Sequence, residues 1–244
     1  MRIPRCYTTQ PLTPHQPISL EDEPAHHLRH VLRMRTGNQI ILFDNSGDEF
    51  QAHLDQVSRQ GVSALVGEQI RHETETQLVI HLIIGISRGE RMDLVLQKAT
   101  ELGVTHITPS FTQRCVVKLD DKKRINRMAH WQRVIVSACE QSGRCRLPML
   151  DEPVELSTAI SQHNSELALV LDPAAIQPIS KIPPPKSSVS ILIGPEGGLS
   201  DNERDQAIQQ GFLGLRLGPR ILRTETAPLA AIAAIQTLWG DFKF

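Results

Sequence analysis

The stretch LVIHLIIGISRGE, residues 78–90, decides the fold class of this sequence. Its first part, residues 78–86, is almost continuously apolar and rich in Val and Ile, which is typical of a strand buried on both faces of a parallel sheet. Ser87 and Glu90 have the spacing of a capping box. Apolar residues then recur at helical period as far as Leu102, and Gly103 provides a stop. The stretch therefore predicts a strand followed by a helix.

The same alternation continues toward the C-terminus. The pattern predicts strands at 104–109, 167–172, 189–193 and 213–217, and helices at 122–141, 201–210 and 228–239. Residues 176–188 contain four prolines and are interpreted as a stiff connection. Strands that alternate with helices are typical of an α/β domain.

The first part of the sequence has a different pattern. Short strands are predicted at 39–43, 49–54 and 61–68, separated by turn residues, and one helix at 23–33. Several short strands favour a small β-barrel, so we expect two domains that meet near residue 73. Three histidines lie on the predicted helix, but no cysteine or carboxylate stands at ligand spacing, so they are interpreted as facing solvent or RNA rather than a metal.

Composition excludes several classes of protein. The chain has 244 residues, of which 40% are apolar, and its longest apolar runs are shorter than a membrane span. Its beginning lacks the apolar core of an export signal, so we expect a cytoplasmic protein without membrane contact. The four cysteines show no CxxC spacing, which favours free thiols and no metal.

The net charge of -1 hides an uneven distribution. Residues 1–73 carry a net charge of -2, residues 74–150 of +5, and residues 151–244 of -4. The basic middle third is compatible with an RNA partner, because binding depends on the local electrostatic field rather than on the net charge of the whole chain. A solvated helix face is the alternative interpretation.

Two glycine-bearing loops each follow a predicted strand. Residues 193–200, IGPEGGLS, lead into a capping box formed by Ser200 and Glu203, and residues 217–227, LGPRILRTETA, lead into the last helix. Glycine lets a ligand approach the backbone closely. The first loop lacks the pattern of a P-loop and that of a dinucleotide fingerprint, so phosphate binding is not favoured there. A tight turn is the alternative for the first loop, and the small-residue helix 228–239 is interpreted as core or dimer interface.

These loops, together with the segments SRGE (87–90), RCVVK (114–118), ACEQSGR (138–144), HLRHVLR (27–33) and the opening MRIPR, resemble the RsmE family of ribosomal RNA methyltransferases. The resemblance covers nearly the whole chain. It implies membership of the SPOUT superfamily, with residues 1–73 as an RNA-binding PUA-like β-barrel. Residues 74–244 would then form an α/β methyltransferase domain with a trefoil knot, which binds the cofactor and dimerises. Knots are rare, and periodicity alone does not predict one.

The resemblance also implies a reaction and its participants. S-adenosyl-L-methionine would be the cofactor, and a homodimer would methylate N3 of a specific uridine near the 3′ end of 16S rRNA, within the 30S subunit. The implied cofactor-binding residues are Leu171, Asp172, Pro173, Gly194, Pro195, Glu196, Gly197, Gly198, Leu199, Leu217, Gly218, Pro219, Arg220, Ile221, Leu222, Thr224 and Thr226. The implied RNA-binding residues are Arg5, His27, Arg29, Arg33, Arg114, Lys118, Glu140 and Arg144.

Three residues are candidates for catalysis because the uracil N3 must lose a proton. Arg223 or Arg88 would stabilise the negative ring, and Glu225 would accept the proton, with Arg220 and Glu140 as further candidates for these two roles. A helix-start carboxylate is the alternative role for Glu225. A methyltransferase for a ribose 2′-hydroxyl or for tRNA, and a non-catalytic RNA-binding assembly factor, are the alternative functions.

Overall fold

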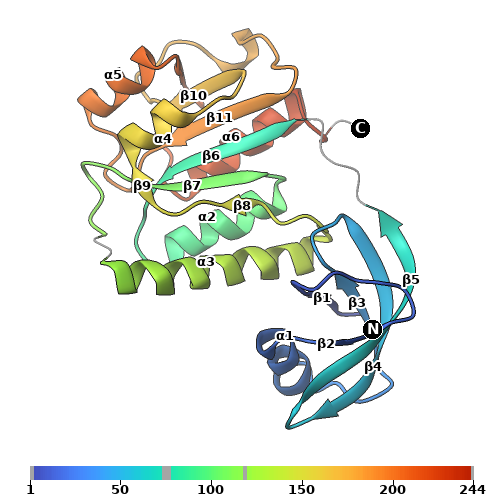
Figure 1. Cartoon of the computed structure of the whole chain (residues 1–244). Coiled ribbons are helices and arrows are strands. Elements are labelled where there is room, and N and C mark those ends of the chain that lie inside the picture. Colours follow the sequence, from blue (N-terminus) through green and yellow to red (C-terminus); the bar gives the residue numbers. More distant parts are fainter. Residues whose placement is uncertain (1–2, 73–77, 118–119, 243–244) are drawn as a thin grey trace. The chain divides into compact units, whose positions relative to one another are not determined.

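A parallel sheet of seven strands forms the centre of the second part of the chain (Figure 1). The computed structural model describes residues 3–72, 78–117 and 120–242. The sheet has the order β12-β10-β11-β6-β7-β8, and β9 also pairs with β7. Its strands are β6 (Val79–Gly85), β7 (His106–Phe111), β8 (Met149–Leu150), β9 (Val154–Glu155), β10 (Leu167–Leu171), β11 (Ser188–Ile193) and β12 (Leu213–Leu215). The predicted α/β class is confirmed.

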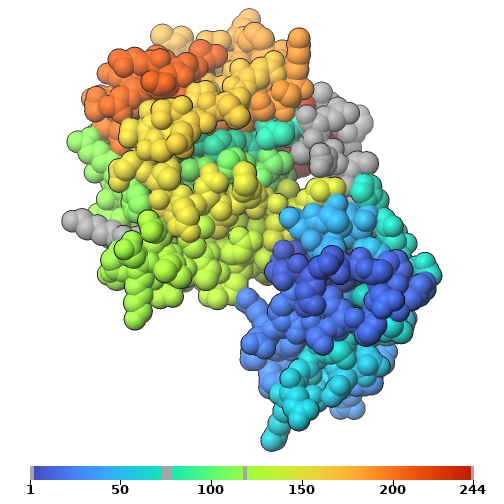
Figure 2. Space-filling view, in the orientation of Figure 1, coloured from blue at the N-terminus to red at the C-terminus, as the bar shows by residue number. Residues whose placement is uncertain are grey.

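Helices cover this sheet. They are α2 (Glu90–Glu101), α3 (Asp121–Ser142), α4 (Leu156–Gln162), α5 (Asp201–Gln209) and α6 (Thr226–Leu238), and one short 3₁₀ turn spans Ile179–Lys181. Ile83 and Leu192 share a buried cluster with Ile160 of α4 and Ala207 of α5, so α4 and α5 pack on one face of the sheet. They lie side by side on the molecular surface (Figure 2). In the view of Figure 1, α6 lies behind the sheet, where it contacts β11 and α2.

The two predicted capping boxes have opposite outcomes. At α5, the Ser200 hydroxyl accepts a hydrogen bond from the Glu203 N–H (3.3 Å), and the Glu203 carboxylate accepts one from the Ser200 N–H (2.7 Å), which confirms the prediction. The prediction at Ser87 is wrong. Gly89 is the N-cap of α2, with φ of +49°, and the Ser87 hydroxyl bonds the carbonyl of Gly85 instead. A glycine turn immediately before the helix displaces the serine from the capping position.

The first part of the chain forms a five-stranded sheet of order β1-β3-β4-β5-β2. Its strands are β1 (Arg5–Tyr7), β2 (Pro17–Ser19), β3 (Gln39–Phe43), β4 (Asp48–Ser58) and β5 (Gly61–His72). The predicted helix at 23–33 is a short α-helix, α1 (Asp22–His26), followed by a π-helical turn, His27–Val31. Leu28 of this turn is fully buried against the apolar side chains of the sheet.

Contacts divide the chain into two compact units. The first unit contains Met1–Glu75 and Val136–Leu147, and the second contains Thr76–Ile135 and Pro148–Phe244. The predicted boundary near residue 73 lies outside the described residues. The C-terminal end of α3 therefore belongs to the unit that the N-terminal strands form, which the strand and helix pattern did not indicate.

Arg5 joins these two segments of the first unit. Its guanidinium pairs with the Glu49 carboxylate and donates to the carbonyls of Cys139 (2.6 Å) and Arg144 (3.0 Å). The Arg5 side chain is only 6% exposed. The predicted RNA contact of Arg5 does not agree with this burial.

Glu140 lies in the same place. Its carboxylate accepts a hydrogen bond from the backbone N–H of Tyr7 (3.0 Å). Burial raises the pKa of Glu140, against the lowering effect of the Tyr7 hydrogen bond and the Arg5 charge. The predicted RNA contact of Glu140 is therefore not supported, because its carboxylate connects the two segments of the first unit.

One face of the parallel sheet carries polar side chains near the amino ends of its strands. His81 shares its face with Ile83, because side chains alternate along a strand. Its Nε2 lies 2.7 Å from the Thr108 hydroxyl, and its Nδ1 lies 3.3 Å from the Ser190 hydroxyl. Burial, together with the charge of His106, lowers the pKa of His81 to about 4. The imidazole is therefore neutral at physiological pH.

We expect this lowered pKa to make the protein less stable in acid. In the unfolded chain, His81 binds its proton below about pH 6.5, whereas the folded protein resists protonation down to about pH 4. The contribution of the neutral His81 imidazole to the free energy of unfolding is therefore fully present above the unfolded-state pKa of about 6.5. It is lost as the pH falls from that value to about 4. Urea unfolding in EDTA buffer should show the wild type losing about 2 kcal/mol more than His81→Gln between pH 7 and pH 5. Equal losses in the two proteins would contradict the burial argument.

Candidate active site

A pocket of about 490 Å³ lies at the carboxyl edge of the parallel sheet. Because the strands are parallel, the loops after β10, β11 and β12 leave the sheet at this same edge. These three loops form the pocket wall, with Arg114 from the loop after β7. The carboxyl edge of an open α/β sheet is the usual place for a ligand site.

Most of the predicted cofactor-binding residues line this pocket. They are Leu171, Asp172, Pro173, Gly194, Pro195, Glu196, Gly197, Gly198, Leu199, Leu217, Gly218, Arg220, Ile221, Leu222 and Thr224. Pro219 and Thr226 are not among the lining residues. The two glycine-bearing loops, which lie about twenty residues apart in the sequence, thus meet at one cavity.

Close backbone packing holds the first glycine loop in place. A Cβ atom on Gly194 would lie 2.7 Å from the backbone nitrogen of Leu199, and one on Gly85 would lie 2.5 Å from Pro195. Larger residues do not fit at either position without a shift of the backbone. The Thr224 hydroxyl donates to the carbonyl of Gly194 (2.9 Å), which ties the second loop to the first.

Glu196 connects the first glycine loop to the segment after β6. Its carboxylate accepts hydrogen bonds from the backbone N–H of Arg88 (3.0 Å) and from the Arg91 guanidinium (3.0 Å). Burial acts to raise the pKa of Glu196, but these hydrogen bonds and the Arg91 charge outweigh it and hold the pKa below its usual value. Glu196 thus remains ionised and positions the Arg88 backbone beside the loop.

Arg114 has a structural role at the pocket. Its guanidinium donates to the carbonyls of Gly197 (3.0 Å) and Leu199 (3.3 Å) in the first glycine loop. The resemblance implied an RNA contact for Arg114, whereas its hydrogen bonds indicate that it supports the loop. The residue is nevertheless exposed and is one of the pocket-lining residues.

Two of the three catalytic candidates lie close together, and one of them, Arg223, lines the pocket, whereas Glu225 is not among the lining residues. Arg223 Nη1 is 3.9 Å from the Glu225 carboxylate, in the segment that precedes α6. The Arg223 side chain is 82% exposed, whereas that of Glu225 is 17% exposed. Glu225 is the N-cap residue of α6 but makes no side-chain capping bond there. Arg88, the third candidate, is exposed and is not a pocket-lining residue.

Five pocket residues were not predicted to bind the cofactor or to act in catalysis or RNA binding: Ile193, Arg204, Leu215, Arg216 and Ala227. Ile193 and Leu215 are the last residues of β11 and β12, so the rule that ligands meet parallel strand ends could have identified them. Arg204 reaches back from α5 to the Asp172 carboxylate at 3.2 Å, a contact without a local sequence signal. With Arg114, Arg220 and Arg223, the pocket is lined by five arginines and two carboxylates.

The remaining RNA-binding candidates are distributed over the chain. In the first unit, His27 and Arg33 are exposed, while Arg29 donates to the Ser58 carbonyl and to His30. Arg144 is half-buried, and its carbonyl accepts from Arg5. Lys118 lies outside the described residues.

Two further expectations concern the chain as a whole. Within the described part of the chain, every helix is too short or too polar to cross a bilayer. All four cysteines are free thiols, as predicted; Cys6, Cys139 and Cys145 are buried and Cys115 is half-buried.

The sequence is similar to known RNA methyltransferases over both parts of the chain. Residues 74–236 match the family model of an RNA methyltransferase domain, and residues 20–66 match that of an RNA methyltransferase PUA domain. The chain is 36% identical over 245 residues to ribosomal RNA small subunit methyltransferase E of Buchnera aphidicola, covering 98% of each chain.

Two solved structures have the same fold over the whole chain. Ribosomal RNA small subunit methyltransferase E of Neisseria gonorrhoeae, bound to S-adenosyl methionine, superimposes with a TM-score of 0.92 and is 40% identical, covering 99% of this chain and 100% of that one. A Legionella pneumophila protein solved with bound SAM gives a TM-score of 0.96 at 40% identity, with the same coverage.

Proposed function

Because this chain belongs to the family of ribosomal RNA small subunit methyltransferase E, we propose that it methylates N3 of a specific uridine near the 3′ end of 16S rRNA, with S-adenosylmethionine as methyl donor. The parallel sheet and the N-terminal PUA domain agree with the SPOUT-type fold that the resemblance implied. The observation that carries the proposal is the pocket between the glycine loops. The pocket is lined by residues of the two glycine loops, by apolar side chains and by five arginines.

The pocket fits the methyl donor in size and chemistry. Its volume of about 490 Å³ is in the usual range for a small-molecule site. Leu171, Leu199 and Leu222 provide apolar walls, and the backbone of the glycine loops provides donors and acceptors for an adenine edge. When bound, S-adenosylmethionine supplies an electrophilic methyl group. The chain's task is then to orient the acceptor, because positioning dominates a transfer of this kind.

Arg223 and Glu225 are placed to act on the acceptor base. The uracil N3 carries a proton at neutral pH, so transfer requires a base and stabilisation of the resulting negative ring. We assign the proton to the Glu225 carboxylate and the stabilisation to the exposed Arg223 guanidinium, which lies 3.9 Å from Glu225 and lines the pocket. Arg88, held through its backbone by Glu196, is the third candidate and would contact the ring or its phosphate.

RNA binding would use exposed basic residues of both units. His27 and Arg33 belong to the first unit, where the half-buried Arg29 lies between them in the sequence, and Arg88 and the pocket arginines belong to the second. The target base must leave its stack, because N3 takes part in Watson–Crick pairing. A 30S particle as substrate would provide a large composite surface for a protein of net charge -1.

The quaternary structure and location are part of the same proposal. Ala233 and Ala234 of α6 are half-buried small residues that allow close approach of a second helix, which fits a homodimer interface. We place the protein in the cytoplasm, where the small subunit is assembled.

Nucleoside analysis tests the reaction, the base and the position together. We expect 16S rRNA from a strain lacking this gene to lose one 3-methyluridine, as seen by nuclease digestion and mass spectrometry, and to regain it on incubation with purified protein and S-adenosylmethionine. Loss of a 2′-O-methyl nucleoside, or of a tRNA methylation, would instead support the alternative methyltransferases. Unchanged RNA together with no S-adenosylmethionine binding would support a non-catalytic assembly factor.

A further inference from the structure

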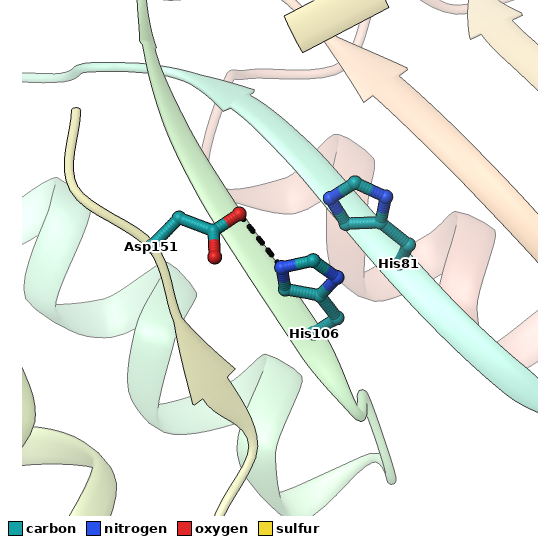
Figure 3. Close-up of side chains that lie close together, drawn as sticks. All are labelled: His81, His106 and Asp151. Atoms are coloured by element: carbon teal, nitrogen blue, oxygen red, sulfur yellow. Dashed lines mark hydrogen bonds and ion pairs between the residues drawn. The ribbon is translucent and has the colours of Figure 1, made fainter. Parts of the chain in front are cut away.

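A second group of reactive side chains lies at the other edge of the parallel sheet from the glycine loops. His81 stands near the beginning of β6, His106 is the first residue of β7, and Asp151 follows β8 (Figure 3). The three side chains point toward one another from these neighbouring segments. Nothing in the proposed methyl transfer uses them, because the pocket lies at the carboxyl ends of the strands.

Their ligand atoms are close enough to share one ion. One nitrogen of each histidine and one oxygen of Asp151 all lie within 4.8 Å of one another. His106 Nε2 is 2.7 Å from Asp151 Oδ2, and the two imidazole rings are stacked with centroids 4.0 Å apart. Ligand atoms around a tetrahedral zinc ion are about 3.3 Å apart. The three atoms would therefore have to move closer together, from separations of up to 4.8 Å, to reach coordination distance.

Neighbouring hydroxyl groups orient these ligands. The Ser190 hydroxyl lies 3.3 Å from His81 Nδ1, which leaves His81 Nε2 to face the cluster. The Thr108 hydroxyl donates to Asp151 Oδ2 (2.6 Å) and lies 2.7 Å from His81 Nε2. Metal-binding histidines and carboxylates are commonly held by such a second hydrogen bond, which fixes the ring or the carboxylate.

The cluster is partly open to solvent. The side chains of His106 and Asp151 are 25% and 35% exposed. Among residues 3–72, 78–117 and 120–242, this is the one group of three His, Cys, Asp or Glu side chains whose ligand atoms converge in this way. The cluster is therefore partly accessible from solvent.

We propose that His81, His106 and Asp151 bind one divalent transition-metal cation, with Zn²⁺ the first candidate and water as the fourth ligand. Two imidazoles and one carboxylate suit Zn²⁺, and also Ni²⁺ and Cu²⁺, much better than Mg²⁺ or Ca²⁺, which prefer oxygen ligands. The sequence pattern indicated no metal site. The three ligands are separated by 25 and 45 residues in the chain, and no ligand spacing connects them.

Co²⁺ titration provides a direct test, because tetrahedral Co²⁺ absorbs visible light and reports its ligands. We expect metal-free protein, without an affinity tag, to bind one equivalent of Co²⁺ with visible d–d bands. Thiolate-to-metal charge transfer in the near ultraviolet should be absent, which distinguishes this site from the free cysteines. One equivalent of Zn²⁺ should displace the Co²⁺ and bleach the bands.

Variants identify the ligands. Asp151→Asn and His106→Gln should each weaken Co²⁺ binding at least tenfold, and Thr108→Val should weaken it about 10- to 100-fold. Asp93→Asn is the matched control, because Asp93 forms a pair with His130 at 2.9 Å on which no third His, Cys, Asp or Glu ligand converges within the described part of the chain. Binding in this control should equal that of the wild type. Circular dichroism in EDTA verifies that each variant is folded.

Two outcomes would overturn the metal site. One is the absence of stoichiometric Co²⁺ and Zn²⁺ binding by the wild type, which would leave the cluster as a purely hydrogen-bonded polar group. The other is equal affinity in the wild type, Asp151→Asn and His106→Gln, which would assign the ion to a different place. Either result would leave the proposed methylation unaffected, since S-adenosylmethionine binding depends on the opposite edge of the sheet.

Discussion

Replacing Arg223 by alanine is expected to slow methyl transfer about 10²- to 10³-fold in single-turnover assays, the usual effect of removing one group that stabilises developing negative charge. The guanidinium lies beside the pocket and 3.9 Å from the Glu225 carboxylate, so it can contact a base presented there. Because its side chain is 82% exposed, its removal should leave the fold intact. Calorimetry should find an almost unchanged affinity for S-adenosylmethionine, which separates catalysis from cofactor binding.

Arg223→Lys keeps the charge and loses the planar guanidinium, so it provides a graded comparison. We expect a rate between those of the wild type and the alanine variant. If Arg223→Ala reacts at the wild-type rate, Arg223 has no part in the mechanism, and Arg88 becomes the first candidate for stabilising the ring.

Replacing Arg5 by alanine is expected to destabilise the protein by about 3–5 kcal/mol, the typical cost of leaving one partner of a buried ion pair alone. The Arg5 and Glu49 side chains are 6% and 7% exposed, and the loss of Arg5 also leaves the carbonyls of Cys139 and Arg144 without this donor. A cost of this size is a large part of the stability of a typical domain. Urea unfolding at neutral pH measures it.

Two further variants define the cause of this loss. Arg59→Ala removes an exposed arginine of the same unit and should change stability by less than about 0.5 kcal/mol. The double variant Arg5→Ala/Glu49→Ala should recover part of the lost stability, because it also removes the buried carboxylate, which Arg5→Ala leaves with only the more distant Arg71 guanidinium at 3.8 Å. If Arg5→Ala unfolds like the wild type and binds RNA more weakly, the original assignment of Arg5 to RNA is correct after all.

The long elements of the second unit could be predicted from sequence because burial on both faces produces continuous apolar runs. Residues 78–86 and 189–193 are examples, and their strands occur within one residue of the predicted ends. β1, β2, β8 and β9 have two or three residues each, too few to show a period. The short helix α4 was missed for the same reason. The π-helical turn at 27–31 also has no sequence pattern that distinguishes it from an α-helix.

The pocket was predictable to the extent that its residues lie in two glycine-bearing loops after parallel strands. The resemblance supplied the cofactor and the base, and it alone implies the knot. Contacts between residues far apart in the chain could not be predicted from the sequence. The residues next to Arg5 in the sequence do not distinguish it from an exposed arginine such as Arg33. Arg5 is buried because it contacts Cys139, which is 134 positions away in the chain. The same limit applies to the pair of Arg204 and Asp172.

The division of the first unit between Met1–Glu75 and Val136–Leu147 has a consequence for synthesis on the ribosome. A growing chain emerges from its N-terminus, and domains generally fold as units. This unit stays incomplete while the next sixty residues are made, because its final segment has not yet been translated. Until that segment is made, Arg5 can pair with Glu49 but lacks the carbonyl acceptors of Cys139 and Arg144. A fragment that ends at residue 73 corresponds to this unfinished nascent chain rather than to an autonomous domain.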